Sequence, residues 1–365
     1  MIVLLSLTVW FYLFFLHGDF WRSAPEAHPV RPLQLPDVDI IVPARDEAQT
    51  IAAVVSSLGQ QDYAGRFRVI LVDDNSSDGT AELATRGCDL QVISLRDKLD
   101  GWSGKLWALN QGVAASAAPI LLFTDADIVH DPRHLSALMA QMQISQALMV
   151  SEMVRLNCVS FAERALVPAF VYFFQMLYPF SRVNDPHAAT AAAAGGTVLI
   201  RRDVLAQIGG FEVIKGELID DVSLAKAVKQ LGPIYLGHSN LANSIRPYPG
   251  FGAIWSMISR TAFTQLRYSS VLLLFTVLGL ALIWLVPIGA VLFAHGWAFL
   301  AGLGAFCLAA ISYIPTLMRY GRQKLWSLAL PLIALFYLAA TLGSACNRWF
   351  GHGATWKSRA YESRN

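Results

Sequence analysis

Residues 120–127 read Ile-Leu-Leu-Phe-Thr-Asp-Ala-Asp, a short apolar run that ends abruptly in two carboxylates. Such a run predicts a strand that is buried on both faces, as in a parallel sheet. Alternate residues at the end of an extended strand point the same way, so Asp125 and Asp127 can converge on one hard cation, Mg²⁺ or Mn²⁺. A cation held this way keeps open positions for phosphate oxygens. The run therefore predicts a metal site at the end of this strand.

The region around this run, from Asp37 to about Leu236, alternates short apolar runs with polar, helix-like stretches. VDIIVPA at residues 38–44 is followed by a helical pattern over residues 46–61, and then by FRVILVDD at residues 67–74. This alternation predicts βαβ units and an α/β fold with a mainly parallel sheet and flanking helices. Ligands bind such sheets beyond the carboxyl ends of the strands, so the residues that end each run are the candidates for a site.

Three of these strand ends carry candidates for nucleotide binding. They are Pro43, Ala44, Arg45, Asp46 and Glu47 at the end of the first strand, Asp73 and Asp74 at the end of the second, and Asp125 and Ala126 at the end of the third. Acidic residues in this place can accept hydrogen bonds from a base edge or from ribose hydroxyls. A turn at Asp78-Gly79, with Ser77 or Asp78 capping the next helix, explains part of the pattern equally well, and both readings can hold together.

Four further residues complete the candidate site. Lys105 ends the sequence GWSGK, where glycines allow close backbone approach and the ammonium group can contact phosphate, although a Walker A loop is absent. Gly196 precedes another apolar run. Asp220 and Asp221 open a helix-like stretch and can supply a general base that removes a proton from an acceptor hydroxyl. The alternative is that one of them only caps the helix.

Histidines 130 and 134 follow the Asp-Ala-Asp motif closely. For His130 and His134 the sequence favours a helix-capping or surface role over a part in the metal site. The four cysteines are scattered without C-x-x-C spacing, so neither a zinc site nor a disulfide framework is indicated.

The composition indicates a membrane-associated chain. Of 365 residues, 55% are hydrophobic and only 15% are charged. The net charge of +2 does not support binding to nucleic acid, which needs basic residues concentrated on one face.

Apolar segments lie at both ends of the chain. Residues 1–17 predict a transmembrane anchor, and the rival is a cleaved signal peptide, which the absence of an early Lys or Arg and of a cleavage site disfavours. Residues 18–36 form a linker, and 268–347 contain candidate spans near 271–294, 297–318 and 326–346. The apolar segment near 161–182, inside the catalytic domain predicted at residues 37–267, predicts an interfacial element, with a buried core helix as the alternative.

The basic residues orient these spans. A loop with Arg319, Arg322 and Lys324 lies two crossings from residues 37–267, so the positive-inside rule puts both in the cytoplasm. A third crossing would put the basic tail, residues 348–365, outside the cell, against the same rule. Either the last segment re-enters or lies at the interface, or the rule fails there.

Taken together, the motifs resemble a family 2 glycosyltransferase with a GT-A fold. From Val38 to Arg267 the elements stand in the family's order: VPARDE, VDDNSSDGT, GK, DAD, GGTVLIRR and DDVSLA. The resemblance implies an inverting hexosyltransferase with a nucleotide-diphosphate sugar donor, a UDP-sugar. It implies that Asp46 and Asp74 contact the nucleotide, Lys105 the phosphates, and Asp125 with Asp127 the metal. Asp221 would be the catalytic base.

The membrane-proximal part departs from the processive members of that family. Their Q/R-x-x-R-W motif is reduced here to Arg260 within Met257–Thr261, which weakens the alternative of a processive polysaccharide synthase. Arg260 can hold the diphosphate or contact lipid headgroups.

The overall pattern is similar to hopene-associated glycosyltransferases of bacterial hopanoid gene clusters. This resemblance implies a lipid acceptor, with a hopanoid as the candidate. It also implies a multi-pass protein of the bacterial inner membrane with a cytoplasmic catalytic domain. The remaining alternative is a membrane protein that binds nucleotide or lipid without turnover.

Overall fold

The computed structural model describes residues 1–22, 25–26, 30–85, 90–95, 98–350, 355–356 and 359–360. The chain forms two compact units: unit 1 comprises residues 1–24, 158–181 and 248–354, and unit 2 comprises residues 25–157, 182–247 and 355–365. Parts of the predicted linker and of the basic tail, with Lys357 and Arg364, lie outside the described residues, as does Cys88.

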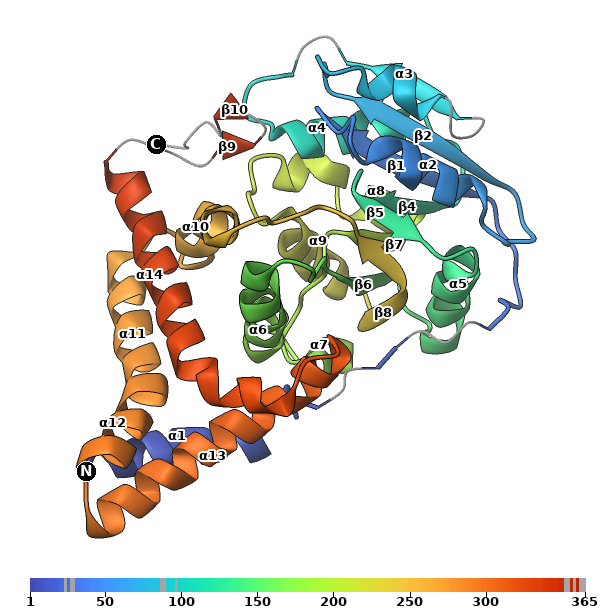
Figure 1. Cartoon of the computed structure of the whole chain (residues 1–365). Coiled ribbons are helices and arrows are strands. Elements are labelled where there is room, and N and C mark those ends of the chain that lie inside the picture. The colour runs from blue at the N-terminus through green and yellow to red at the C-terminus, as the bar shows by residue number, and fades with distance from the viewer. Residues whose placement is uncertain are drawn as a thin grey trace. The chain divides into compact units, whose positions relative to one another are not determined.

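Unit 2 is built on an eight-stranded sheet of order β3-β2-β1-β4-β7-β6-β8-β5 (Figure 1). Its strands are β1 (Val38–Ala44), β2 (Phe67–Asp73), β3 (Gln91–Ser94), β4 (Ile120–Thr124), β5 (Ile128–His130), β6 (Met149–Arg155), β7 (Thr197–Arg201) and β8 (Ile234–Ser244). Strand β1 pairs in parallel with β2 and β4, β2 with β3, and β6 with β8. Strand β7 runs antiparallel to β4 and β6, and β5 antiparallel to β8. The predicted α/β fold with a mainly parallel sheet is confirmed.

Helices cover both faces of this sheet. They are α2 (Ile51–Gly59), α3 (Thr80–Ala84), α4 (Gly104–Ala114), α5 (His134–Ser145), α8 (Arg202–Gln207), η1 (Gly210–Ile214) and α9 (Asp220–Lys229), with the end of α7 (Phe180–Asn184). Because side chains alternate along a strand, Ile40 packs in the core cluster with Val54 of α2 and Leu138 of α5, whereas Ile41 lies beneath α4. A Cβ atom at Gly112 of α4 would come within 2.4 Å of Ile41 Cγ2, so glycine permits this close approach. All seven residues of β1 are buried, as expected for a strand covered on both faces.

The strand directions collect polar residues at one edge of the sheet. Strands β1, β2 and β4 end there. Because β7 is antiparallel to both β4 and β6, strand β6 runs in the same direction as β4, and β6 and its parallel neighbour β8 end at this edge too. Antiparallel β7 instead begins at this edge, which brings the Gly195-Gly196 segment beside the end of β4. This is the edge at which α/β sheets bind ligands.

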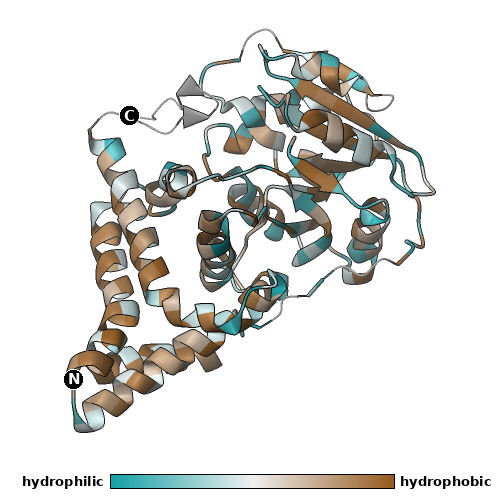
Figure 2. Cartoon of the chain, viewed as in Figure 1, coloured by the Kyte–Doolittle hydropathy of each residue, from teal (hydrophilic) through white to brown (hydrophobic). Residues whose placement is uncertain are grey.

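Unit 1 is a set of mostly apolar helices, and Figure 2 shows hydrophobic residues along α11 to α14. The helices are α1 (Ile2–Phe15), α6 (Phe161–Leu177), α10 (Phe251–Gln265), α11 (Ser270–Leu280), η2 (Ala281–Leu285), α12 (Val286–Phe293), α13 (Gly296–Arg319), η3 (Lys324–Ala329) and α14 (Leu330–Trp349). Three helical stretches, Ser270–Phe293, Gly296–Arg319 and Lys324–Trp349, are long and apolar enough to cross a membrane. They agree with the three predicted C-terminal segments; the crossing itself stays a prediction, as does the anchor role of the shorter α1.

Polar contacts tie the remaining helices into unit 1. The η2 segment is a π-helical turn, whose carbonyls at Leu282 and Ile283 accept hydrogen bonds from Ser6 Oγ at 2.8 Å and Trp10 Nε1 at 2.7 Å in α1. Helix α6 lies in the segment near 161–182, for which the sequence predicted an interfacial element, with a buried core helix as the alternative. Most of its residues are buried within the structure, and Tyr172 Oη lies 2.7 Å from Ser312 Oγ of α13.

Candidate active site

A pocket in unit 2 lies at the sheet edge described above. It is lined by Pro43, Lys105, Leu106, Leu109, Phe123, Thr124, Asp125, Gly195, Val198, Phe211, Asp220, Asp221 and Leu224. Sequence reasoning predicted the polar members Lys105, Asp125, Asp220 and Asp221 from separate motifs, and the structure brings them to one cavity. Gly195 and Phe211 were not predicted.

Lys105 is the charged centre of this pocket. It is the second residue of α4, a helix that begins where Ser103 Oγ accepts a hydrogen bond from the Leu106 N–H. Its Nζ atom lies 2.7 Å from Asp125 Oδ1 and 3.9 Å from Asp220 Oδ2. Burial alone would lower the pKa of Lys105, but the neighbouring carboxylates outweigh it and raise this pKa above its ordinary value. Lys105 is therefore a fixed positive charge at physiological pH.

Asp221 is held from two sides. Its Oδ2 accepts a hydrogen bond from the Gly195 N–H at 2.9 Å, and its Oδ1 accepts one from the Val222 N–H at 2.8 Å. Burial, and next the charge of Asp220, raise the pKa of Asp221 to about 7, although Lys105 acts in the opposite direction. A carboxylate with a pKa near neutrality is suited to take up a proton during a reaction. The helix-cap alternative is wrong, because the N-cap residue of α9 is Ile219, which makes no side-chain cap, and Asp220 and Asp221 are the first two residues inside the helix.

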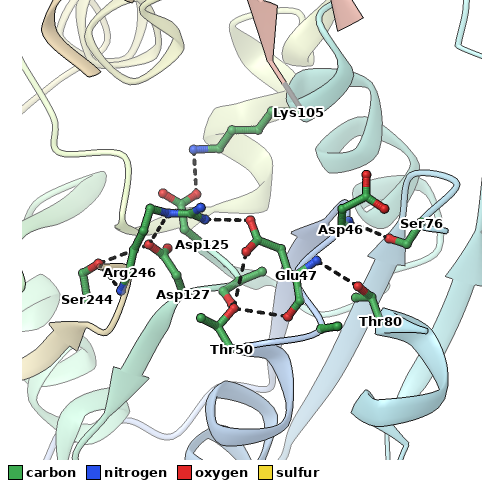
Figure 3. A network of polar contacts seen from close by, with 12 residues as sticks. Asp46, Glu47, Thr50, Ser76, Thr80, Lys105, Asp125, Asp127, Ser244 and Arg246 are labelled. Carbon is green, nitrogen blue, oxygen red and sulfur yellow. Dashed lines mark hydrogen bonds and ion pairs between the residues drawn. The ribbon is translucent and has the colours of Figure 1, made fainter. Parts of the chain in front are cut away.

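Asp127 belongs to a second cluster beside the pocket, shown in Figure 3. Its Oδ2 lies 2.8 Å from Arg246 Nε and accepts a hydrogen bond from Ser244 Oγ at 3.1 Å. The same guanidinium donates from Nη2 to Glu47 Oε1 at 2.6 Å. Burial raises the pKa of Asp127 and outweighs the opposing charge of Arg246. The pKa of Arg246 is raised, because the attraction of Asp127 and Glu47 exceeds the effect of its burial.

The loops after β1 and β2 interlock at the predicted nucleotide end of the site. Arg45 Nη1 donates to the Asp74 carbonyl at 2.5 Å and lies 3.5 Å from Asp74 Oδ2, while Asp46 Oδ1 accepts from the Ser77 N–H at 2.9 Å. Asp46 has a left-handed backbone at φ 50°, and so has Asn75 at φ 60°. Non-glycine residues rarely adopt this conformation, and those that do are often found at functional sites.

One buried carboxylate oxygen at the end of β2 accepts no hydrogen bond from the described residues. Asp73 Oδ2 accepts from the Ser76 N–H, but Oδ1 has no hydrogen-bond partner among the described residues. Because an unpaired buried acceptor is costly, it is a candidate contact for a ligand donor.

The other predicted residues of unit 2 lie at or near this edge. The Ala44 carbonyl accepts from the Asp74 N–H, and the Ala126 carbonyl from Thr50 Oγ1, each at 2.8 Å. The Gly196 carbonyl accepts from the Asp125 N–H at 3.3 Å. Arg260 lies on α10 in unit 1, and its role stays a prediction.

Two sets of residues were missed or misjudged from the sequence. Arg246 follows the carboxyl end of β8 by two residues, so the strand-end rule that selected Asp46 and Asp125 would have found it. The expected capping or surface role of His130 and His134 is wrong. These side chains are 3% and 0% exposed and hydrogen-bond to each other in the interior, because β5 pairs with β8 and α5 packs against β6 and β8.

The acidic residues fit a hard divalent cation that shares its ligands with a substrate. Among the described residues, no group of three or more His, Cys, Asp or Glu side chains could hold a metal ion by itself. Mg²⁺ commonly binds through one or two carboxylates, with phosphate oxygens and waters completing its shell. Asp125, partly exposed in the pocket, and Asp127 provide such a pair, and Lys105 and Arg246 compensate their charge in this structure. The metal assignment stays a prediction.

A solved structure shares the fold of this chain. It is the mannosyltransferase PcManGT from Pyrobaculum calidifontis in complex with GDP-Man and Mn²⁺, with a TM-score of 0.58 and 20% sequence identity, covering 96% of this chain and 98% of that one. At this identity the likeness concerns the fold alone. The predicted fold class, a GT-A α/β fold with a mainly parallel sheet and flanking helices, is confirmed.

Residues 39–209 match the family described as Glycosyl transferase family 2. The chain therefore carries a glycosyltransferase family 2 domain, and the predicted enzyme class is confirmed for this domain.

Curated relatives share shorter segments with the chain. The 4,4'-diaponeurosporenoate glycosyltransferase of Staphylococcus haemolyticus (strain JCSC1435) is 33% identical over 98 residues, which are 27% of this chain and 26% of the relative. The protein of the same name from Staphylococcus aureus (strain USA300) is 38% identical over 90 residues, 24% of this chain and 23% of the relative. The chain thus matches about a quarter of the length of these relatives.

Proposed function

We propose that this protein is an inverting, metal-dependent glycosyltransferase that moves a sugar from a nucleotide-diphosphate donor, a UDP-sugar, to a lipid acceptor. The observation that carries the proposal is the pocket in which Lys105, Asp125, Asp220 and Asp221 meet at the binding edge of a GT-A sheet. Residues from three separate parts of the chain build it. A domain that only binds nucleotide does not need a base with a pKa near 7 in the same cavity.

In this mechanism the chain's own residues bind the donor and accept the proton. Asp46, Asp73 and Asp74 contact the nucleotide, and Lys105 contacts the diphosphate. Asp125 and Asp127 would hold Mg²⁺ or Mn²⁺, which when bound neutralises charge on the departing diphosphate. Asp221 takes the proton of the acceptor hydroxyl, whose oxygen attacks the anomeric carbon as the bond to the diphosphate breaks.

The lipid acceptor rests on separate observations. Three helices are apolar and long enough to cross a membrane, and the relatives at 33% and 38% identity are named 4,4'-diaponeurosporenoate glycosyltransferase. We propose an isoprenoid acceptor reached from the bilayer, a hopanoid being the specific candidate. The protein would be a multi-pass protein of the bacterial inner membrane with its catalytic unit in the cytoplasm, and Arg260 would contact the diphosphate or a headgroup.

The test is a donor screen with the full chain in lipid nanodiscs. UDP-glucose, UDP-galactose, UDP-N-acetylglucosamine and GDP-mannose are each incubated with Mn²⁺ and a bacterial total lipid extract, and products are identified by mass spectrometry. We expect one lipid to gain a single sugar. Long polymers would instead identify a polysaccharide synthase, and nucleotide binding without transfer or donor hydrolysis would identify a non-catalytic protein.

Matched substitutions test the roles of the carboxylates. Asp221→Asn is expected to lower kcat by about 10²- to 10⁴-fold, the usual contribution of a general base, with the donor KM nearly unchanged. Asp203→Asn is the control, because Asp203 is exposed and pairs with Arg201 on the surface. Full transfer by Asp221→Asn, or by Asp127→Asn, would refute the corresponding role.

A further inference from the structure

Behind the pocket, four buried polar side chains form a continuous line of hydrogen bonds. Thr124 Oγ1 of β4 lies 3.0 Å from His130 Nε2 of β5, and His130 Nδ1 lies 2.7 Å from His134 Nδ1 of α5. His134 Nε2 lies 3.0 Å from Glu152 Oε2 of β6. Each of these residues is at most 3% exposed. Such a line of titratable groups in the interior is unusual for a purely structural core.

The direction of each hydrogen bond follows from the first. Thr124 Oγ1 also lies 3.1 Å from the Gly196 carbonyl, which can only accept, so the single hydroxyl proton of Thr124 is donated there. The hydroxyl must then accept from His130 Nε2–H. A neutral His130 protonated at Nε2 has an acceptor at Nδ1, and His134 therefore donates from Nδ1–H.

The far end of the line holds one further proton. With His134 protonated at Nδ1, a hydrogen bond between its Nε2 and Glu152 Oε2 requires a proton on one of these two atoms. The pair is either imidazolium with carboxylate or neutral imidazole with carboxylic acid. In both forms the four groups together carry no net charge, as a buried cluster requires. The second oxygen of Glu152, Oε1, has no hydrogen-bond partner in the described part of the chain.

A second proton on His130 would break the line. It would place two N–H donors face to face between His130 and His134, 2.7 Å apart. In agreement, burial, and then the proximity of His134, hold the pKa of His130 well below its usual range. Two further titratable groups are electrostatically coupled to this line: Asp131 to His134, and Tyr235 of β8 to Glu152.

The Thr124 end of the line reaches the two carboxylates of the pocket. The Gly196 carbonyl accepts both from Thr124 and from the Asp125 N–H, which ties the start of β7 to the turn that carries Asp125. The preceding residue, Gly195, donates its N–H to Asp221. One short segment, Gly195-Gly196, therefore relates the predicted metal ligand to the predicted base.

We propose that Thr124, His130, His134 and Glu152 are positioning residues of this site, acting through the Gly195-Gly196 segment to set the geometry of Asp125 and Asp221. This inference rests on the proposed function for its catalytic consequence. The hydrogen-bond directions that it specifies can be tested without any measurement of activity.

The first experiment reads the protonation of the histidines directly. The full chain, labelled with ¹⁵N-histidine and reconstituted in lipid, is examined by solid-state NMR at pH 7, where the ¹⁵N shifts separate protonated from unprotonated ring nitrogens. We expect His130 to carry its proton on Nε2 only, and His134 to carry one on Nδ1. His130→Gln and His134→Gln assign the signals. A proton on Nδ1 of His130 would overturn the proposal.

The second experiment uses two threonines that lie side by side on the neighbouring strands β4 and β7. Thr124 and Thr197 are register partners in the pairing of β4 with β7, and both are buried. The Thr124 hydroxyl makes two hydrogen bonds, whereas the Thr197 hydroxyl has no partner among the described residues. Thr197→Val is thus a matched control for Thr124→Val, and Thr124→Ser keeps the hydroxyl.

The readouts are Mn²⁺ affinity, measured by electron paramagnetic resonance with Mn²⁺ alone, and the kinetic constants of transfer. Thr124→Val is expected to weaken Mn²⁺ binding and to lower kcat by about fivefold or more, the scale of one or two hydrogen bonds. Thr124→Ser and Thr197→Val are expected to stay within about twofold of the wild type.

Equal losses in Thr124→Val and Thr197→Val would overturn the proposal, because a general packing defect would then explain both. If the wild-type protein neither binds Mn²⁺ nor transfers sugar, the proposed function fails, and the histidine tautomers still decide whether the line exists as described.

Discussion

Replacing Arg246 by Met removes the cation that joins two buried carboxylates from distant parts of the chain. The Asp127 and Glu47 side chains are 9% and 10% exposed, and both lie within 2.8 Å of the guanidinium. Methionine keeps much of the aliphatic length without the charge. The substitution therefore removes from two neighbouring anions in the interior the guanidinium that pairs with both.

The expected cost follows from this burial. Breaking a fully buried ion pair by removing one partner costs about 3–5 kcal/mol. The Arg246 side chain is 33% exposed, so water screens part of the interaction, and we expect about 2 kcal/mol. For a folded unit of this size such a loss lowers Tm by about 4–8 °C.

The assay is thermal unfolding of the full chain in detergent, followed by intrinsic tryptophan fluorescence. Arg133→Met is the control, because Arg133 Nε also lies 2.8 Å from a carboxylate, that of Asp131, but its side chain is 54% exposed. Because water screens an exposed ion pair, Arg133→Met should lower Tm much less than Arg246→Met does.

A double substitution separates the ion pair from general packing. Glu47→Gln in the Arg246→Met background removes one of these two neighbouring anions, so the double variant should be more stable than the sum of the single losses by about 1 kcal/mol. Strict additivity, or equal losses in Arg246→Met and Arg133→Met, would refute the reasoning.

Four further outcomes follow. Because Asp221 acts as a base only when ionised, kcat/KM should rise with pH to a plateau above about 7. Asp220→Asn should move the midpoint of this rise to lower pH, because it removes a charge that raises the pKa of Asp221. A pH–rate profile that is flat from pH 5 to 8 would contradict this role. Gly195→Ala puts a Cβ 3.2 Å from Asp221 Oδ2, so kcat should fall while Tm stays within about 2 °C. Gly112→Ala, whose Cβ would lie 2.4 Å from Ile41 Cγ2, should cost about 1–3 kcal/mol of stability, and an unchanged melting curve would contradict it. EDTA should abolish transfer and excess Mn²⁺ should restore it; activity that survives exhaustive chelation would exclude the metal role.

The strands and their polar ends could be predicted from the sequence because both are local patterns. The apolar runs VDIIVPA and ILLFTDAD became β1 and β4 with boundaries that differ little from the prediction. Their carboxylates met in one region because parallel strands end at one edge of a sheet. The three apolar C-terminal segments were likewise recognisable, since long uninterrupted hydrophobic stretches have few alternatives to helices.

The buried histidines could not be recognised in this way. A histidine after a strand is polar in any sequence pattern, and its burial depends on which helix covers it. His130 and His134 are enclosed only because β5 pairs with β8 and α5 packs against β6, neither of which the local pattern contains.

Local sequence patterns specify which residue types stand at the ends of which strands, since hydrophobic periodicity and strand-end chemistry are read over a few residues. Which of these charges meet depends on the arrangement of the whole sheet. Glu47 and Arg246 are 199 positions apart, and antiparallel β7, inserted between β4 and β6, brings Gly195 to Asp221 and Gly196 to Asp125. The reason is physical: charge pairing depends on strand order, and strand order is set by long-range packing of the whole sheet.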